Sequence, residues 1–313
     1  MSIALVVNPH SGGGSTARKL PQIVAAVERM GTAAVYPTTG PGDGIRQARR
    51  AVEEGHERVI AVGGDGTINE VVNGLFQGKT LTREGVVFGV IHAGTGGDFV
   101  KSLRVPAGLQ EAAELAVSGV PRAIDVMHVS FVDHDGEPAE RLCINVLGFG
   151  MNGEVVRRAN ASSKRWGGRL TFAGATLGAL VAYTPPRVEV QWEGPEGEGA
   201  WSGPLSSAFV ANGAYCGGGM WVGRGGRLDD GAAELTLIPE LPIARAILAT
   251  PHLYRGTTPN VKGVSSAKVQ KLLAEGRDQA PVLVDLDGEQ PGVLPMRVEI
   301  LGKVLLVAGQ LAY

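Results

Sequence analysis

The sequence RVIAVGGDGTINEVVNGL, residues 58–75, decides the fold class of the first half of the chain. It begins with a run of aliphatic residues, which is typical of a buried strand. A loop of glycines around a single acid follows, and residues 68–75 then favour a helix. A buried strand that leads through a short loop into a helix is the repeating unit of a parallel α/β sheet.

The same rhythm runs through residues 1–124. The segment 17–30 shows the helical pattern most clearly, because Leu20, Ile23, Val24 and Val27 fall on one face. We expect strands at 3–7, 33–36, 58–62 and 86–91, and helices at 17–30, 43–54, 68–75 and 109–118. This alternation predicts an N-terminal doubly wound α/β domain with helices on both faces of its sheet.

After residue 124 the pattern changes to successive strand-like runs with turn signals between them. We expect strands at 123–132, 141–147, 187–192, 205–212, 234–238, 269–273, 282–286, 296–301 and 304–307, helices at 152–160 and 170–182, and an exposed hairpin loop at 193–204. This order predicts a C-terminal antiparallel β-rich sandwich domain at 125–300. The last residues, 301–313, are expected to form a strand that returns to the first domain.

Composition excludes several classes of protein. The 313 residues carry a formal net charge of −2, which argues against a nucleic-acid partner. Two cysteines cannot form a disulfide framework, and the six histidines show no zinc-ligand spacing. The longest uncharged run, residues 170–186, is too short and too interrupted to span a bilayer. We therefore expect a cytoplasmic protein.

Two of the glycine-rich loops follow expected parallel strands directly, at the edge of the sheet where ligands gather. The first, NPHSGGGS at residues 8–15, precedes a helix, so its backbone N–H groups could bind an anion. The alternative is a flexible turn. The second is GGDGT at residues 63–67, in which Asp65 is the informative residue. The alternative for this loop is a helix cap supplied by Asp65 or Thr67.

Asp65 would repel a phosphate bound in its own loop. A carboxylate ~4 Å from a phosphate oxygen costs about 4 kcal/mol at an effective dielectric constant near 20. A divalent cation between the two groups reverses the sign of that energy. The loop therefore predicts Mg²⁺ that bridges Asp65 to a nucleotide phosphate.

Two further loops contain acids. The segment GTGGDF, residues 94–99, follows another expected parallel strand and is weak evidence alone. The segment DLDGE, residues 285–289, ends a strand of the second domain. Strand alternation would place Asp285, Asp287 and Glu289 on one side, facing a site or solvent. A solvated hairpin tip is the alternative.

Taken in order, these loops resemble the diacylglycerol kinase catalytic family, which includes sphingosine kinases and related bacterial lipid kinases. The continuation INEVVNG after GGDGT is the specific part, and residues 212–220 and 228–231 also match stretches of the family's second domain. Gly97 stands where the family usually places Asn, and His92 where it commonly places Pro. The resemblance implies an α/β nucleotide domain, a β-rich domain and an active site in the cleft between them.

The resemblance also implies roles for individual residues. The general base would be Glu289, and Asp65 would lie beside the magnesium ion and the phosphates. A second, structural Mg²⁺ would be held by the side chain of Asp230 and the carbonyls of Arg227 and Ala232. The ATP-binding residues would be Asn8, Pro9, His10, Ser11, Gly12, Thr38, Gly64, Asp65, Gly66, Thr67, Ile68, Asn69, Glu70 and Thr95.

The function implied is an ATP- and Mg²⁺-dependent lipid kinase that phosphorylates a hydroxyl of diacylglycerol or a similar lipid at a membrane surface. The stripe of Phe172, Leu177, Leu180 and Val181 could line an acyl cleft, touch the bilayer or simply form core. One alternative is an NAD kinase, whose family shares the GGDG loop. The other is a non-catalytic nucleotide-binding regulator, for which Gly97 is the only support. A homodimer is left open.

Overall fold

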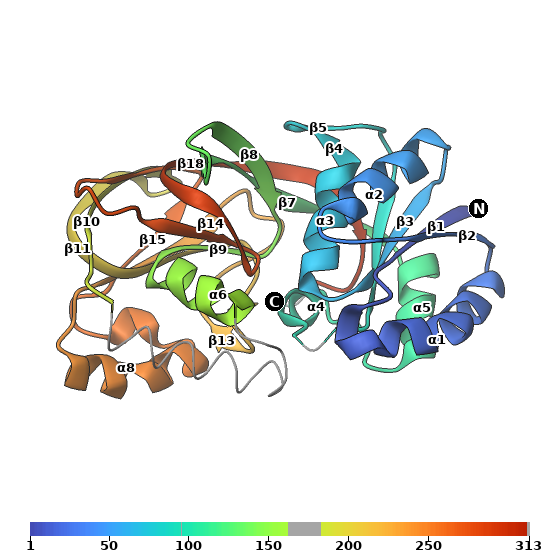
Figure 1. Cartoon of the computed structure of the whole chain (residues 1–313), viewed down its shortest axis with the longest axis horizontal. Helices are drawn as coiled ribbons and strands as arrows, with labels where there is room; N and C mark the ends of the chain where they lie inside the picture. The colour runs from blue at the N-terminus through green and yellow to red at the C-terminus, as the bar shows by residue number, and fades with distance from the viewer. Residues whose placement is uncertain (95, 162–182, 312–313) are drawn as a thin grey trace. The chain divides into compact units, whose positions relative to one another are not determined.

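The chain folds into two compact units. The computed structural model describes residues 1–94, 96–161 and 183–311. The first unit comprises Met1–Val126 with Leu301–Tyr313, and the second comprises Met127–Ile300. Two long strands pass from one unit to the other, β7 (Pro121–Asp133) and β18 (Glu289–Ala308). Figure 1 shows the elements of each unit in chain order.

The first unit is built on a parallel sheet in the order β2–β1–β3–β6. The register pairs Ile3 with Ala33 and with Arg58, and Arg58 with Val87. The end of β18 joins the same sheet, because Leu306 pairs in parallel with Val87. The strands are β1 (Ser2–Val7), β2 (Thr32–Pro37), β3 (Arg58–Gly63) and β6 (Val87–His92). The predicted α/β fold class is confirmed.

Helices cover both faces of this sheet (Figure 1). Helices α1 (Ser11–Glu28) and α5 (Leu109–Ser118) pack together over alternate side chains of β1, namely Ile3, Leu5 and Val7. Helices α2 (Asp43–Glu53) and α3 (Asp65–Leu75) pack together against the other face. The short elements are α4 (Asp98–Ser102), β4 (Phe76–Gln77) and β5 (Thr80–Leu81).

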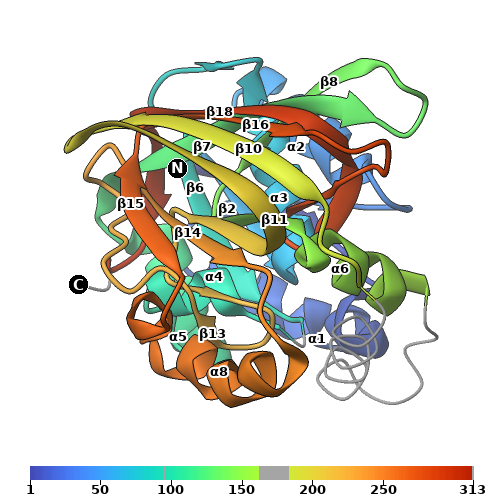
Figure 2. The ribbon, with the colours of Figure 1, turned by 90° about the vertical axis from the view of Figure 1, so that its left-hand side faces the viewer.

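The second unit is antiparallel, as predicted (Figure 2). Inward side chains at every second position, such as Val188 and Val190 or Leu272 and Ala274, form its core. Its strands are β8 (Pro138–Cys143), β9 (Val146–Gly150), β10 (Arg187–Gly194), β11 (Gly197–Ala211), β12 (Tyr215–Cys216), β13 (Met220–Trp221), β14 (Ala233–Pro239), β15 (Ser265–Val269), β16 (Lys271–Gly276) and β17 (Leu283–Leu286).

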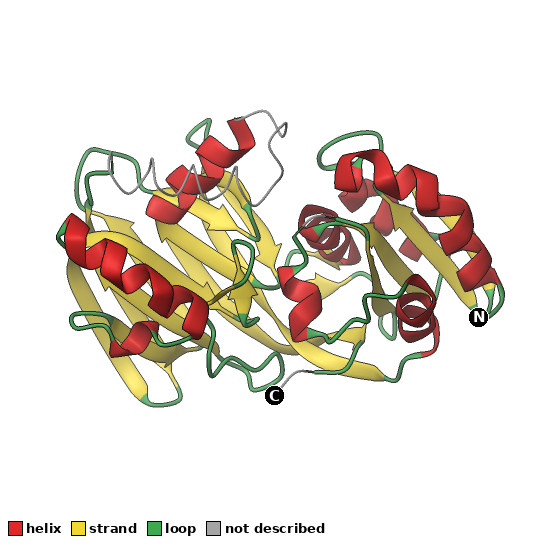
Figure 3. Ribbon diagram, turned by 90° about the horizontal axis from the view of Figure 1, so that it is seen from below, coloured by secondary structure: helices red, strands yellow, loops and turns green. Residues whose placement is uncertain are grey.

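Two helices lie beside these strands in Figure 3, α6 (Met151–Ala161) and α8 (Ile243–Arg255). A 3₁₀ turn, Thr258–Asn260, follows α8. Helix α6 was predicted and α8 was not, because Pro242 and Pro251 interrupt its helical signal. The expected helix at 170–182 and the stripe from Phe172 to Val181 lie outside the described residues. Across the described chain, every helix is too short or too polar to cross a bilayer.

Several expected elements of the second unit were wrong in detail. The expected strand at 141–147 is two strands, β8 and β9, separated at residues 144–145. The expected loop at 193–204 is mostly paired strand, since Glu193 pairs with Glu198 and the turn is confined to residues 195–196. The expected strand at 269–273 breaks at Gln270, whereas 296–301 and 304–307 belong to the single strand β18.

Candidate active site

Three loops of the first unit meet at the carboxyl ends of its parallel strands. The side-chain amide of Asn8, after β1, donates to Oγ1 of Thr67 at 3.3 Å, and Thr67 lies in the first turn of α3, in the segment that follows β3. The N–H of Ala93, after β6, donates to the carbonyl of Gly63 at 2.9 Å. Oγ1 of Thr16 donates to the carbonyl of Ala93 at 3.2 Å. The structure therefore brings these three predicted loops together.

Glycines permit this close approach. A Cβ at Gly12 would lie 2.6 Å from the carbonyl oxygen of Ala93, and one at Gly94 would lie 2.6 Å from Cα of Gly64. Gly12, Gly13 and Gly14 all have positive φ, which other residues rarely adopt. The backbone of the first loop therefore lies directly against the loop after β6.

Asp65 lies at the first turn of α3, within this group of loops. Its Oδ2 accepts a hydrogen bond from the N–H of Gly97 at 2.8 Å. Its Oδ1 is buried, and no described residue donates a hydrogen bond to it. The first N–H groups of a helix have no partner within the helix, and the N-cap residue of α3, Gly64, has no side chain to cap them. The site therefore places the N-terminus of a helix beside one carboxylate oxygen that has no hydrogen-bond donor among the described residues.

Nδ1 of His92, at the end of β6, is also buried without a partner among the described residues. His92 was not among the predicted site residues, since a lone histidine after a strand carries no motif. Thr95, predicted to bind the nucleotide, lies outside the described residues.

The loop between β2 and α2 is fixed by two acids. Glu70 accepts from the N–H groups of Gly42 and Gly44, at 2.7 and 2.8 Å. Burial alone would raise the pKa of Asp43, but hydrogen bonds from Thr39 and Arg46 outweigh it and hold that pKa at about 2. Glu70 therefore acts here as a tether between α3 and the start of α2.

The remaining predicted nucleotide-binding residues fall into two groups. Ile68 and Asn69 are buried. The side chain of Ile68 belongs to the core, and its backbone N–H donates to the carbonyl of Gly64. Thr38 is buried at the end of β2. The exposed or half-buried positions at the loop edge are Asn8, Pro9, His10, Ser11, Gly12, Gly64, Asp65 and Gly66.

Glu289 begins β18 in the second unit, immediately after a tight turn. Asp287 and Gly288 both have positive φ, 51° and 89°, which is the geometry of a two-residue hairpin turn. The expected placement of Asp285, Asp287 and Glu289 on one side of a strand was therefore wrong. The half-exposed carboxylate of Glu289 forms an ion pair with Nη1 of Arg141 at 2.8 Å.

Asp287 anchors the turn between β8 and β9. Its Oδ1 accepts from the N–H groups of Asn145 and Val146, both at 3.0 Å, and its Oδ2 accepts from that of Ile144 at 2.9 Å. Three backbone donors directed at one carboxylate interrupt the ladder, which explains why one expected strand became two. Burial raises the pKa of the neighbouring Cys143 thiol, with a further contribution from the charge of Asp287.

At the second predicted metal position, the carboxylate of Asp230 pairs with the ammonium group of Lys268. Oδ2 of Asp230 lies 2.7 Å from Nζ of Lys268, and Oδ1 accepts from the N–H of Ala232 at 3.3 Å. Arg227 pairs with Asp229. The described residues contain no group of three or more acidic, His or Cys side chains that could hold a metal. The predicted ligands here are one side chain and two backbone carbonyls, so the second magnesium site stays a prediction.

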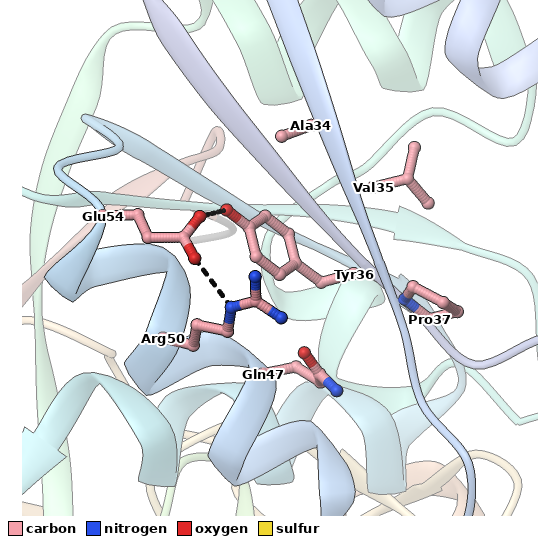
Figure 4. Close-up of a pocket in the computed structure, with 7 residues that line it drawn as sticks. All are labelled: Ala34, Val35, Tyr36, Pro37, Gln47, Arg50 and Glu54. Atoms are coloured by element: carbon pink, nitrogen blue, oxygen red, sulfur yellow. Dashed lines mark hydrogen bonds and ion pairs between the residues drawn. The ribbon is translucent and has the colours of Figure 1, made fainter.

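A separate pocket of about 400 Å³ lies beside the edge strand β2 (Figure 4). Tyr36 donates to Oε2 of Glu54 at 2.5 Å, and Arg50 lies over its ring. Burial, with the hydrogen bond and charge of Glu54, raises the pKa of Tyr36 to about 12. This pocket lies among α2 and β2 side chains, apart from the residues of the three loops.

Comparison with known proteins identifies the family. Residues 2–129 match the family described as "Diacylglycerol kinase catalytic domain", and residues 145–309 match the "YegS C-terminal NAD kinase beta sandwich-like domain". The chain belongs to the diacylglycerol kinase catalytic family. It is therefore a phosphotransferase of the lipid kinase class, with an α/β domain followed by a β-sandwich domain.

Relatives in this family align over most of the chain. A "Probable lipid kinase YegS-like" protein of Chromohalobacter salexigens is 33% identical over 70% of this chain and 67% of its own length. The "Diacylglycerol kinase" of Bacillus subtilis (strain 168) is 28% identical, over 93% and 90%. A solved diacylglycerol kinase structure from Bacillus anthracis shares the fold at 19% identity, with a TM-score of 0.69, over 99% of this chain and 97% of that one.

Proposed function

We propose that this lipid kinase transfers the γ-phosphate of ATP to a hydroxyl group of diacylglycerol or a similar lipid, with Mg²⁺ as cofactor. The kinase class follows from the family, whereas the donor, the metal and the acceptor are our inference. Family membership favours this reaction over the NAD kinase alternative. The observation that carries it is Asp65, a carboxylate at the N-terminus of α3 with one oxygen that no described residue bonds.

Two features support nucleotide binding by the three loops. The N–H groups in the first turn of α3 and the partial positive charge at its N-terminus favour a phosphate group. The left-handed glycines 12–14 leave backbone rather than side chains at the surface of the first loop. A polyphosphate would therefore meet N–H donors from both sides.

The free oxygen of Asp65 fits a magnesium ion. A buried carboxylate oxygen without a hydrogen bond costs free energy unless a cation or donor approaches it. Asp65 Oδ1 is such an atom, and an oxygen ligand is what Mg²⁺ prefers. When bound with ATP, the ion would neutralise charge on the transferred phosphoryl group.

Glu289 is proposed as the general base. During transfer, the bond from the γ-phosphorus to the bridging oxygen of ATP breaks as a bond to the lipid oxygen forms. The hydroxyl proton leaves at the same stage, and the Glu289 carboxylate would accept it. The ion pair with Arg141 holds that carboxylate in one orientation. ADP leaves, and the proton on Glu289 returns to solvent.

The test is transfer of labelled γ-phosphate from ATP to a panel of lipids, with and without Mg²⁺. We expect product with diacylglycerol or a similar lipid, and a loss of roughly 10²–10⁴-fold for Glu289→Gln. Asp65→Asn should lose Mg²⁺–ATP affinity as well as rate. A matched control is Glu140→Gln, an exposed acid of β8 whose carboxylate pairs with His128 and not with a residue of either proposed site.

Two results would contradict the proposal. Undiminished transfer by both Asp65→Asn and Glu289→Gln would remove the assigned roles. Conversion of NAD to NADP, without phosphorylation of any lipid, would support the NAD kinase alternative instead. ATP binding without any turnover would favour the regulator.

A further inference from the structure

The outward face of α8 is apolar. Ile247 and Tyr254 are each 53% exposed, and Leu248 is 76% exposed. Because residues at i, i+4 and i+7 share one face of a helix, Ile247, Pro251 and Tyr254 form a single stripe with Leu248 beside it. This outer stripe of α8 faces away from the strands that support the helix.

Such a cluster is unusual for this chain. In the described part of the second unit, the large exposed hydrophobic side chains all belong to α8. The corresponding residues of the first unit are far apart in the chain: Val35 lies in β2, whereas Met1 and Val120 lie outside helices and strands. A local group of exposed apolar residues on an otherwise ordinary surface indicates a binding surface.

The inner face of α8 holds the helix firmly on the second unit. Leu253 packs against a cluster that contains Val146, Phe209 and Val222. Val146 is also one of the residues whose N–H groups bind Asp287, two positions before Glu289. The outer stripe is therefore part of the same packed body as the proposed general base.

The charge of this region favours an anionic partner. Residues 241–263 contain Arg245, Arg255 and Lys262 and no acidic residue, although the whole chain has a net charge of −2. All three basic side chains are exposed. Arg245 and Arg255 lie at opposite ends of the outer stripe. Apolar residues flanked by long basic ones are the pattern of a helix that lies in a membrane interface.

We propose that the outer stripe of α8 binds the surface of an anionic lipid bilayer. The choice of a bilayer rests on the proposed function, because a long-chain lipid acceptor resides in a membrane and the enzyme must reach it there. Ile247, Leu248 and Tyr254 enter the boundary between headgroups and acyl chains. Arg245 and Arg255 remain at the level of the phosphates.

The direct test measures binding of the full chain to vesicles, without nucleotide. Vesicles of phosphatidylcholine and phosphatidylglycerol in equal parts are sedimented with the wild type and with the double variant Ile247→Gln/Leu248→Gln. We expect the double variant to partition at least about tenfold less, since two aliphatic side chains no longer enter the lipid. Val120→Gln, which removes a side chain that is 68% exposed in the first unit, should bind as the wild type does.

A second pair of variants tests the charge. Arg245→Gln and Arg255→Gln should each weaken binding roughly fivefold, and salt should abolish the difference. Arg122→Gln, an exposed arginine at the start of β7, is the matched control. Equal binding to vesicles of phosphatidylcholine alone would overturn the electrostatic part of the proposal.

Assays of kinase activity distinguish the proposed docking surface on α8 from the proposed function. With a short-chain diacylglycerol dispersed as monomers, the α8 variants should keep the wild-type rate, while their rate on vesicle-borne diacylglycerol falls. Vesicle binding that is unchanged in Ile247→Gln/Leu248→Gln would overturn the docking surface, as would a change only in oligomeric state. Vesicle binding through α8 without phosphorylation of any lipid would support the docking surface and contradict the kinase proposal.

Discussion

The imidazole of His92 takes up the space that a side chain at position 97 would need. A Cβ added to Gly97 would lie 2.9 Å from Nε2 of His92. Gly97 has a φ of 87°, in the left-handed region that Asn tolerates better than other residues with side chains. The two departures from the family's usual Pro and Asn, at positions 92 and 97, are therefore coupled, which weakens the argument that Gly97 marks a non-catalytic protein.

This coupling predicts the outcome of a double-mutant cycle. Gly97→Asn alone should weaken Mg²⁺–ATP binding, because the new side chain displaces His92 or the loop that donates to Asp65. His92→Ala/Gly97→Asn should recover much of the affinity, with a coupling free energy of roughly 0.5–3 kcal/mol. Calorimetric titration of the four proteins measures it. Strictly additive effects would show that the two positions do not interact.

Asp287 should stabilise the second unit. In Asp287→Asn an NH₂ group replaces one acceptor oxygen, so at least one of the N–H groups of residues 144–146 loses its partner. We expect a loss of about 1–3 kcal/mol in the free energy of unfolding. Asp133→Asn is the matched control, because Asp133 also accepts two backbone N–H groups but in an exposed turn. Urea denaturation measures the free energy of unfolding of both variants. Equal losses of that free energy would contradict a special role for Asp287.

The elements of the first unit could be predicted because each is encoded locally. The helix expected at 109–118 has those bounds in the structure, and each predicted parallel strand overlaps an observed one. Continuous aliphatic runs and one apolar helix face are visible within a short window of sequence. Asp65, the acid among the glycines, likewise identifies its loop from the local sequence alone.

The partners of the site residues could not be predicted, because they come from distant parts of the chain. Glu289 pairs with Arg141, 148 positions earlier, and Asp230 pairs with Lys268, 38 positions later. Strand alternation predicted one face for Asp285 and Asp287, whereas the backbone N–H groups of residues 144–146 turn Asp287 inward. Periodicity within one segment carries no information on such contacts.

Asp285 should make stability depend on pH. Burial raises the pKa of its carboxyl group from 3.8 to about 8, although the N–H of Gly288 donates to it. Between these values the folded chain holds a proton that the unfolded chain has released. This contribution to stability is complete below the unfolded pKa and is lost as pH rises toward 8, with a slope of at most about 1.4 kcal/mol per pH unit.

Asp285→Asn, which is neutral at every pH, should remove that slope. Urea unfolding of both proteins between about pH 5 and about pH 8 measures the difference. The wild type should lose stability over this range relative to the variant. A variant whose pH dependence matches that of the wild type would show that Asp285 is ionised in the folded chain.

Lys268 should make the acidic turn at residues 228–232 independent of metal. Its ammonium group lies 2.7 Å from Asp230 and 3.7 Å from Glu234, and the hydrogen bond to Asp230 raises the pKa of Lys268. Without nucleotide, EDTA should therefore leave the melting temperature of the wild type unchanged. Lys268→Met leaves two neighbouring carboxylates without a cation, so it should melt lower, and Mg²⁺ should restore part of the loss. Lys271→Met, which breaks an exposed pair with Glu193, should show neither effect. A wild type that EDTA destabilises would instead support the second magnesium site at Asp230.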